Sequence, residues 1–339
     1  MSALTSLTLG AGPVVRRPSL LKAEARRFRS RRLIRNLLLL GVIGYAVTVV
    51  VMFTQYEKPS AEGLRDARQR VDQMVAEQAQ YHAECVKTTP PDGMTIDDYC
   101  GPVPTASDFG DLSNFLPRQA FGLERGFGDF AQVFGIGFAA LAFLIGATWI
   151  GAEWSSKNLA SWLTWEPRRI RVMAAKLTVL TVLVAVMAAL VQVAWWGTGY
   201  LLASTRGVTD VPVDFWGEQW AMQGRLIAFA VLAALGGFAL ANLTHNTGAA
   251  FGIAFLYFAG VETAVRLLNP EWQRWLLTDN SIGFINPKGW TVVWLDPSSF
   301  MGIESRVFLS HWGSFGTLAV VTGVVLLAGI GLVARRDLS

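Results

Sequence analysis

Six long apolar runs are the feature of this sequence that most restricts its fold. Each run is close to the roughly 20 mostly apolar residues that a transmembrane helix needs. The runs are continuous instead of alternating, which favours helices over the strands of a barrel. With 52% hydrophobic and only 16% charged residues, the chain is too apolar for a typical soluble domain. We therefore expect an all-α polytopic membrane protein, with spans at residues 33–53, 130–150, 172–202, 226–243, 249–268 and 315–333.

The distribution of basic residues orients these spans. An even number of spans places both termini on the same side of the membrane. If that side is the cytoplasm, the cytoplasmic segments hold 16 Lys and Arg against 4 Asp and Glu, and the exterior holds 13 against 21. Lys and Arg resist translocation in short flanking segments, so both termini are predicted to be cytoplasmic. The basic excess then indicates topology and contact with anionic membrane lipid, and not nucleic-acid binding.

The segments that flank the spans differ in character. Residues 1–32 are predicted to form a cytoplasmic tail and an amphipathic interfacial helix, because Leu21, Ala25 and Phe28 share one helical face among arginines. A plain basic flank to the first span is the alternative. The other flanking segments are an extracytoplasmic loop at 203–225, a tryptophan-rich extracytoplasmic cap at 269–314 and a cytoplasmic tail at 334–339.

The large extracytoplasmic loop at 54–129 contains both cysteines of the chain. Near-heptad spacing predicts a helix from about Ala61 to Glu84 within it. Cys85 and Cys100 follow, on either side of a Pro-Pro-Asp-Gly turn. In an oxidising exterior we expect them to be disulfide-bonded instead of free, which should contribute roughly 3 kcal/mol. A metal site is not expected, because His82 offers only one further ligand nearby.

Motifs that would make the chain an enzyme are absent. No G-x-x-x-x-G-K-[ST] occurs, so the chain lacks the usual phosphate loop for hydrolysing ATP. H-E-x-x-H and G-x-S-x-G are also absent, and the three histidines are scattered. We therefore predict a non-enzymatic chain with no metal site and no cofactor of its own.

The cytoplasmic segment 151–171 joins spans two and three and is the longest cytoplasmic connection between spans. It begins with an amphipathic piece rich in tryptophan, and Pro167 separates that piece from a basic cluster. A short amphipathic helix in this position is suited to docking into a groove of a cytoplasmic partner. A helix that lies on the lipid surface is the alternative. The candidate contact residues are Glu153, Trp154, Leu159, Trp162, Leu163, Trp165 and Arg168.

Span five carries an acidic and a basic residue near its outer end. Glu262 and Arg266 stand at i and i+4, in the order that favours pairing on a helix. Charges at membrane depth are candidates for function, but a helix that ends near Glu262, with the pair solvated, explains them as well. The aromatic residues of this span fit either packing or a substrate path; they are Phe251, Phe255, Tyr257 and Phe258.

Four motifs, taken in order with the six spans, resemble one known family. They are Gly151-Ala-Glu153 after span two, Glu166-Pro167-Arg168-Arg169, Ala175-Lys176 at the start of span three, and the ending Ala334–Ser339, "ARRDLS". This arrangement resembles the permease subunits of ABC transporters of the type-2 exporter class, over nearly the whole chain. The large first exterior loop with its cysteine pair departs from many simple members, which leaves exterior partners and the transported class open.

The resemblance implies a working unit of two permease chains and a dimer of ATPase subunits, with ATP and magnesium bound in the ATPase partner. Segment 153–166 would receive the ATPase motion, and a lipid-like or amphipathic cargo would cross the plasma membrane of a bacterium. A non-catalytic membrane sensor or scaffold, and a membrane enzyme or ion-coupled carrier, are the alternatives. The implied substrate path follows spans two and five, with Phe134, Phe138, Phe251, Phe255, Tyr257, Phe258 and Glu262 as its candidate residues.

Overall fold

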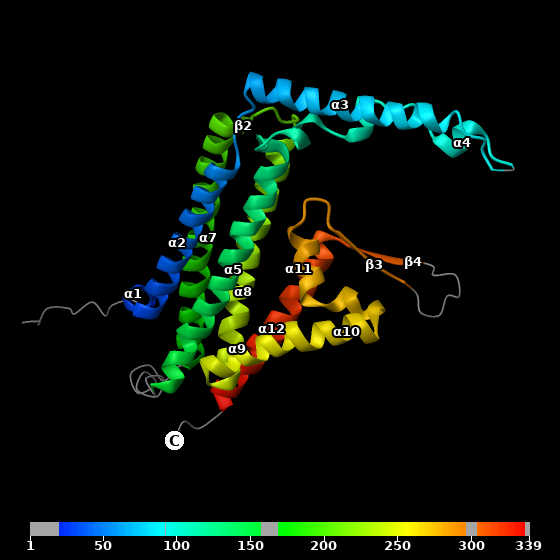
Figure 1. Cartoon of the computed structure of the whole chain (residues 1–339). Coiled ribbons are helices and arrows are strands. Elements are labelled where there is room, and N and C mark those ends of the chain that lie inside the picture. The colour runs from blue at the N-terminus through cyan, green and yellow to red at the C-terminus, as the bar shows by residue number, and fades with distance from the viewer. Residues whose placement is uncertain (1–19, 92, 157–168, 296–303, 336–339) are drawn as a thin grey trace, which may run out of the picture.

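A bundle of long apolar helices forms the body of the molecule. The computed structural model describes residues 20–91, 93–156, 169–295 and 304–335. Within those residues, six helices are long and apolar enough to cross a membrane, so the chain has the fold of an all-α polytopic membrane protein (Figure 1). They are α2 (Arg32–Gln55), α5 (Leu123–Ser155), α7 (Arg169–Arg206), α8 (Phe215–Thr244), the stretch from α9 to α10 (Thr247–Leu268) and α12 (His311–Arg335).

Glycines allow α5 and α8 to pack closely at the centre of this bundle. A Cβ atom at Gly146 of α5 would overlap the carbonyl oxygen of Ala234 in α8. Conversely, a Cβ atom at Gly237 of α8 would overlap the carbonyl oxygen of Phe143 in α5. Small residues of this kind let membrane helices approach until their backbones touch, which maximises dispersion contacts where no hydrophobic driving force operates. These two helices are therefore the rigid centre on which the other helices pack.

The first span, α2, is loosely attached to this centre. Only 6% of its apolar window is buried, against 61% for α5, so most of α2 faces the surroundings of the bundle. A short amphipathic helix, α1 (Leu20–Ser30), lies before α2 and buries Glu24 and Phe28 against the bundle. We call this end of the bundle the α1 end. The turn between α8 and α9 lies at the same end.

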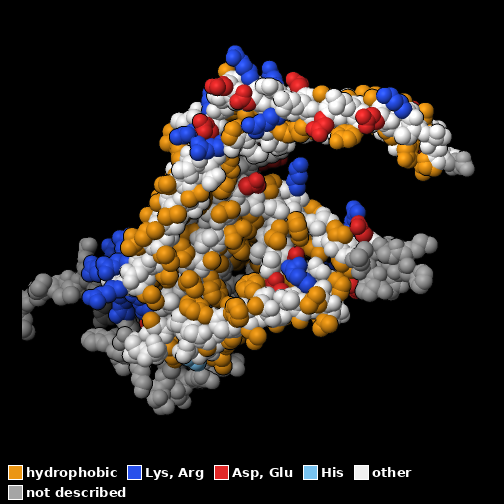
Figure 2. Space-filling model, in the orientation of Figure 1, with side chains coloured by type: hydrophobic (Ala, Val, Ile, Leu, Met, Phe, Trp, Pro, Cys, Tyr) orange, Lys and Arg blue, Asp and Glu red, His pale blue; other side chains and the backbone are white. Residues whose placement is uncertain are grey.

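An arm projects from the opposite end of the bundle. It consists of α3 (Ala61–Cys85), capped by the Ser60 side chain, and a return segment with α4 (Ile96–Cys100), η1 (Ala106–Phe109) and η2 (Leu112–Phe115). The predicted disulfide between Cys85 and Cys100 is present, with a Cα–Cα distance of 5.8 Å. Figures 1 and 2 show the arm reaching sideways, beyond the bundle that supports it. We call this end of the molecule the arm end.

The segment after α8 builds a cap beside the bundle. Span five begins as α9 (Thr247–Phe255), continues through a π-helical stretch (Leu256–Val261) and ends as α10 (Glu262–Leu268). A π-helical stretch shifts the register of the following turn, so α10 is rotated relative to α9. The remaining cap elements are η4 (Pro270–Trp275), α11 (Leu277–Ile285) and an antiparallel hairpin of β3 (Trp290–Leu295) and β4 (Glu304–Leu309).

Two short features were not predicted from the sequence. The β3–β4 hairpin makes the cap partly β-structured. At the arm end, β1 (Phe121–Gly122) pairs in parallel with β2 (Gly207–Val208), which joins the start of α5 to the end of α7. A Cβ atom at Gly207 would overlap the carbonyl oxygen of Phe121, so glycine is required for this contact.

Candidate functional site

A buried ionic cluster lies at the α1 end, where the chain enters and leaves segment 157–168. Glu153 lies near the end of α5, just before that segment, and Lys176 lies near the start of α7, just after it. The Nζ atom of Lys176 lies 2.7 Å from the Glu153 carboxylate and 2.9 Å from the carboxylate of Glu24 in α1. The side chains of Lys176 and Glu24 are fully buried. One ammonium group therefore holds together α1, α5 and α7.

Arg31 completes the cluster from the junction between α1 and α2. Its guanidinium lies 2.8 Å from the Glu153 carboxylate and donates to the carbonyl oxygens of Thr148 and Trp149, at 3.1 and 2.8 Å. Burial lowers the pKa of Arg31 from its ordinary value, and the neighbouring Glu153 carboxylate opposes that shift. Arg27 of α1, whose side chain is 37% exposed, also lies 3.7 Å from the Glu24 carboxylate. The two carboxylates are thus compensated by Lys176 and Arg31 inside the cluster and by Arg27 at its edge.

The indole ring of Trp149 forms the apolar wall of this cluster. The Arg31 guanidinium carbon lies 4.5 Å from the ring centroid, and the Lys176 Nζ lies 4.9 Å from it. The ring of Phe28 packs edge-on against the same indole, with 5.2 Å between centroids. A cation desolvated against a tryptophan face gains about 2 kcal/mol or more. The ring therefore helps to offset the cost of burying the two cations.

Trp154 joins a fourth part of the chain to the same region. Its Nε1 donates to Asn242 Oδ1 at 3.1 Å, and its ring meets the His245 ring edge-on, with 3.9 Å between centroids. His245 ends α8 in the left-handed conformation, at φ 56°. A Cβ atom at Gly151 would overlap Oγ1 of Thr247 in α9, so the turn between α8 and α9 lies directly against the end of α5. The end of α5 is thus held on two sides.

The predicted contact residues of segment 151–171 fall into two groups. Glu153 and Trp154 are described, and both are engaged within the chain. Glu153 forms ion pairs with Lys176 and Arg31 of the same chain. The other predicted residues lie outside the described part of the chain; they are Leu159, Trp162, Leu163, Trp165 and Arg168.

The charged pair of span five belongs to a second cluster, in the cap. The Glu262 side chain is 5% exposed, so it is not solvated, whereas Arg266 is 36% exposed. Arg266 lies 3.7 Å from Glu262 but only 2.7 Å from Asp279 of α11. Glu262 accepts a hydrogen bond from the backbone N–H of Thr278 at 3.0 Å. The pair therefore ties the end of span five to the cap.

The aromatic residues of the predicted substrate path lie in different environments. Phe134 and Phe138 are buried and border a cavity beside α2, whereas Phe255 and Phe258 are exposed on span five. The Tyr257 hydroxyl accepts a hydrogen bond from the N–H of Leu277 at 3.2 Å. Phe251 packs against Phe143 of α5, with 6.2 Å between ring centroids.

Glu24, Arg31 and Trp149 are cluster residues that were not predicted from the sequence, and Lys176 was noted only as part of a motif. One signal was available. Glu24 is the single acidic residue in the basic helix α1, and Lys176 is a single charge in an apolar run. Isolated opposite charges of this kind on apolar faces are candidates for mutual pairing. Nothing in the sequence distinguished Trp149 from the other tryptophans.

Comparisons with protein-family models, with curated proteins and with solved structures find no match to this chain. Within the described residues, no three His, Cys, Asp or Glu side chains are placed to hold a metal ion. At the α1 end, charged side chains join helices that are distant in sequence, beside the two points where segment 157–168 connects to the bundle.

Proposed function

We propose that this chain is the permease subunit of an ABC exporter of the type-2 class. It works with a second permease chain and a dimer of cytoplasmic ATPase subunits, which bind ATP and magnesium. The cargo is lipid-like or amphipathic and crosses the plasma membrane. The observation that carries this proposal is the ionic cluster, because it joins α1 to both flanks of the segment whose sequence resembles a coupling helix.

The ionic cluster is placed where it can transmit a movement of segment 157–168 to the helices of the bundle. A force on segment 157–168 reaches the bundle through Glu153 on one side and through the start of α7 on the other. Because Lys176 links Glu153 to Glu24, α5, α7 and α1 respond as one body and not as separate helices. The loosely packed α2 follows α1 directly in the chain. ATP-driven closure of the ATPase dimer is thereby converted into movement of the spans relative to one another.

The charge distribution supports a cytoplasmic location for the α1 end. Figure 2 shows Lys and Arg side chains gathered beside α1, and acidic side chains spread along the arm among basic ones. Positive charge on the cytoplasmic side is the normal consequence of membrane insertion. A reporter fused after Ser339 or inserted at Asn246 should be cytoplasmic, and one inserted at Asp92 should be exterior. A reversed pattern would contradict this orientation.

The ATPase partnership is tested by affinity purification of this chain from cells that also express a candidate ABC ATPase subunit. Trp162→Ala removes a large apolar side chain from the predicted docking face, and a central interface tryptophan contributes about 2 kcal/mol or more. We expect capture of the ATPase to fall roughly 30-fold, the equivalent of that energy. Trp312→Ala, at an 83% exposed position in the first turn of α12, is the matched control and should leave capture unchanged.

Two results would contradict the proposal. If the wild-type chain captures no ATPase and does not alter ATPase turnover in lipid, the partnership is wrong. If Trp162→Ala captures the ATPase as well as Trp312→Ala does, while insertion of both is normal, segment 153–166 does not dock and instead lies on the lipid surface.

A further inference from the structure

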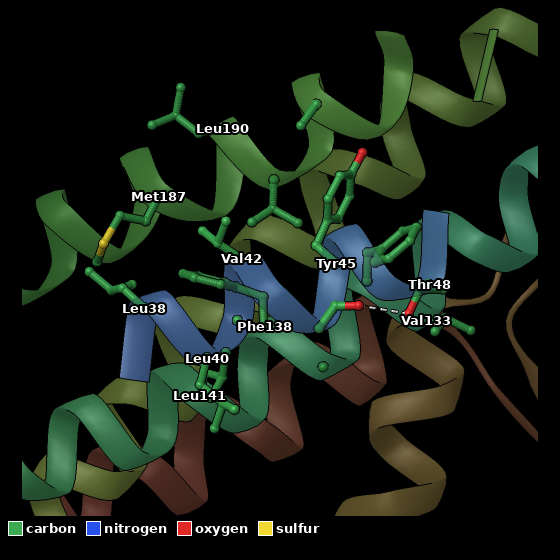
Figure 3. A pocket seen from close by; sticks show the side chains of 16 residues that line it. Leu38, Leu40, Val42, Tyr45, Thr48, Val133, Phe138, Leu141, Met187 and Leu190 are labelled. Carbon is green, nitrogen blue, oxygen red and sulfur yellow. Dashed lines mark hydrogen bonds between the residues drawn. The ribbon is translucent and has the colours of Figure 1, made fainter. Parts of the chain in front are cut away.

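An apolar cavity of about 700 Å³ lies between α2, α5 and α7. Its size is within the roughly 300–1,000 Å³ that is usual for ligand sites. Figure 3 shows side chains from the three helices pointing into it. Two hydroxyl groups border it, and each is already bonded: Tyr45 to the Thr198 hydroxyl at 2.5 Å, and Thr48 to the Gly44 carbonyl at 2.9 Å. The cavity therefore offers contact surface and almost no free polar group.

Glycines create this space. A Cβ atom at Gly44 of α2 or at Gly137 of α5 would have no neighbouring atom within 4 Å. These positions are thus open, unlike Gly146 in the tightly packed centre. The rim residues Val42 and Leu190 are exposed, so the cavity opens sideways between α2 and α7.

The position of the cavity along the helices shows which part of the bilayer it faces. At 1.5 Å per residue, Leu38 lies about 10 Å and Thr48 about 25 Å along the chain from Arg31 in the ionic cluster. On α7, Ala194 lies about 27 Å from Lys176 by the same count. The hydrocarbon core of a bilayer is about 30 Å thick. With the ionic cluster at one edge of that core, the cavity runs from about 5 Å on the α1 side of the membrane centre to about 10 Å into the leaflet at the arm end. Acyl chains are the solvent at that depth.

The length of the cavity and the chemistry of its lining both indicate which molecule fills it. The part of α2 that lines the cavity, from Leu38 to Thr48, is about 15 Å long. This length is half of a hydrocarbon core of about 30 Å. One acyl chain covers the same depth in one leaflet. Water would gain almost no hydrogen bonds there, and an apolar cavity excludes it. An empty cavity would lose dispersion contacts with the side chains of α2, α5 and α7.

We propose that this cavity binds one acyl chain of a membrane phospholipid from the leaflet at the arm end. The chain enters between α2 and α7 and lies along the face formed by Gly44 and Gly137, with its headgroup outside the cavity at the membrane surface. The bound chain fills the space that separates α2 from α5, so it acts as a wedge between the loosely packed first span and the rigid centre. This site does not depend on the exporter function proposed above.

The test uses the full chain in nanodiscs that contain a phosphatidylcholine with a diazirine on one acyl chain. After illumination, adducts are mapped by mass spectrometry of peptides. We expect adducts concentrated on the cavity residues of α2, α5 and α7 in the wild type. Gly44→Leu and Gly137→Leu fill open space and should reduce these adducts several-fold. Gly197→Leu is the matched control, because Gly197 on α7 is also open but does not line the cavity, and it should leave them unchanged.

Every other outcome overturns the proposal. Equal adducts in the wild type and the filled variants would show general contact with surrounding lipid only. Unchanged adducts together with an altered oligomeric state of Gly44→Leu would show that the cavity accommodates a second copy of this chain. Adducts confined to exposed positions outside the cavity would show that no acyl chain enters it.

Discussion

Replacing Lys176 with methionine is the most direct perturbation of the ionic cluster. Methionine is similar in length and apolar, so the change removes the charge with little change in packing. Glu153, now 2.7 Å from the ammonium group, would then keep its ion pair with Arg31. Glu24, now 2.9 Å from the ammonium group, would keep the partly exposed Arg27 at 3.7 Å. Removing one partner of a buried ion pair costs about 3–5 kcal/mol, because an uncompensated charge stays buried.

The expected effect is measured as the thermal unfolding midpoint of the purified chain in mild detergent. A cost of 3–5 kcal/mol corresponds to a decrease of roughly 5–15 °C for a chain of this size. Arg306→Met is the matched control. It breaks an ion pair with Glu304 at the same 2.7 Å distance, but the two side chains are 67% and 51% exposed. An exposed pair contributes about 0–1 kcal/mol, so the control should shift the midpoint by a few degrees at most.

A double variant separates charge balance from packing. Lys176→Met with Glu24→Gln leaves Glu153 facing Arg31, so the buried charge is again balanced. We expect this variant to recover most of the lost stability. The reasoning is refuted if Lys176→Met is no less stable than Arg306→Met, or if the double variant is less stable than Lys176→Met.

Three further predictions concern other parts of the chain. Gly146→Ala should lower the thermal midpoint strongly, because the added Cβ overlaps the Ala234 carbonyl oxygen, whereas Gly236→Ala on α8 has open space and should be nearly neutral in the same assay. Cys85→Ser should destabilise the arm by about 3 kcal/mol, as expected for a closed loop of about 15 residues; faster hydrogen exchange confined to α3 and α4 would support this, and unchanged exchange would oppose it. Burial raises the pKa of Asp279, so its native form binds protons more readily than its unfolded form. Stability should therefore increase as the pH falls from neutral through the native pKa, and Asp279→Asn should flatten that part of the profile of midpoint against pH.

The sequence was sufficient for the parts of the fold that depend on local pattern. Continuous apolar runs predicted the six long helices, because the length of a run and its lack of alternation are local properties. The disulfide followed from the presence of only two cysteines, both in one loop that was predicted to be exterior. The β3–β4 hairpin was missed, although "WTVVWL" from Trp290 to Leu295 is rich in aromatic and β-branched residues, which favour strands. These tryptophans were interpreted only as part of a tryptophan-rich cap.

The candidate site could not be predicted from the sequence, and the reason differs from the one for the hairpin. Lys176 and Glu24 are 152 positions apart in the chain, and Arg31 and Glu153 are 122 apart. Periodicity shows which face of a helix is apolar, but it does not show which distant helix that face will meet. Glu153 was singled out from a motif, and its surroundings suggested a contact with another protein. Only the packing of α1 across the ends of α5 and α7 shows that its partners lie in the same chain.

The close contact between α5 and α8 also determines the order in which the molecule can be built. Helices enter a membrane in the order of their synthesis, and α7 lies between these two in the chain. While the nascent chain ends at α7, the glycine surface of α5 has no partner, and α7 must leave the insertion machinery before α8 can reach α5. The centre of the bundle therefore assembles late, by the return of the fourth span to the second.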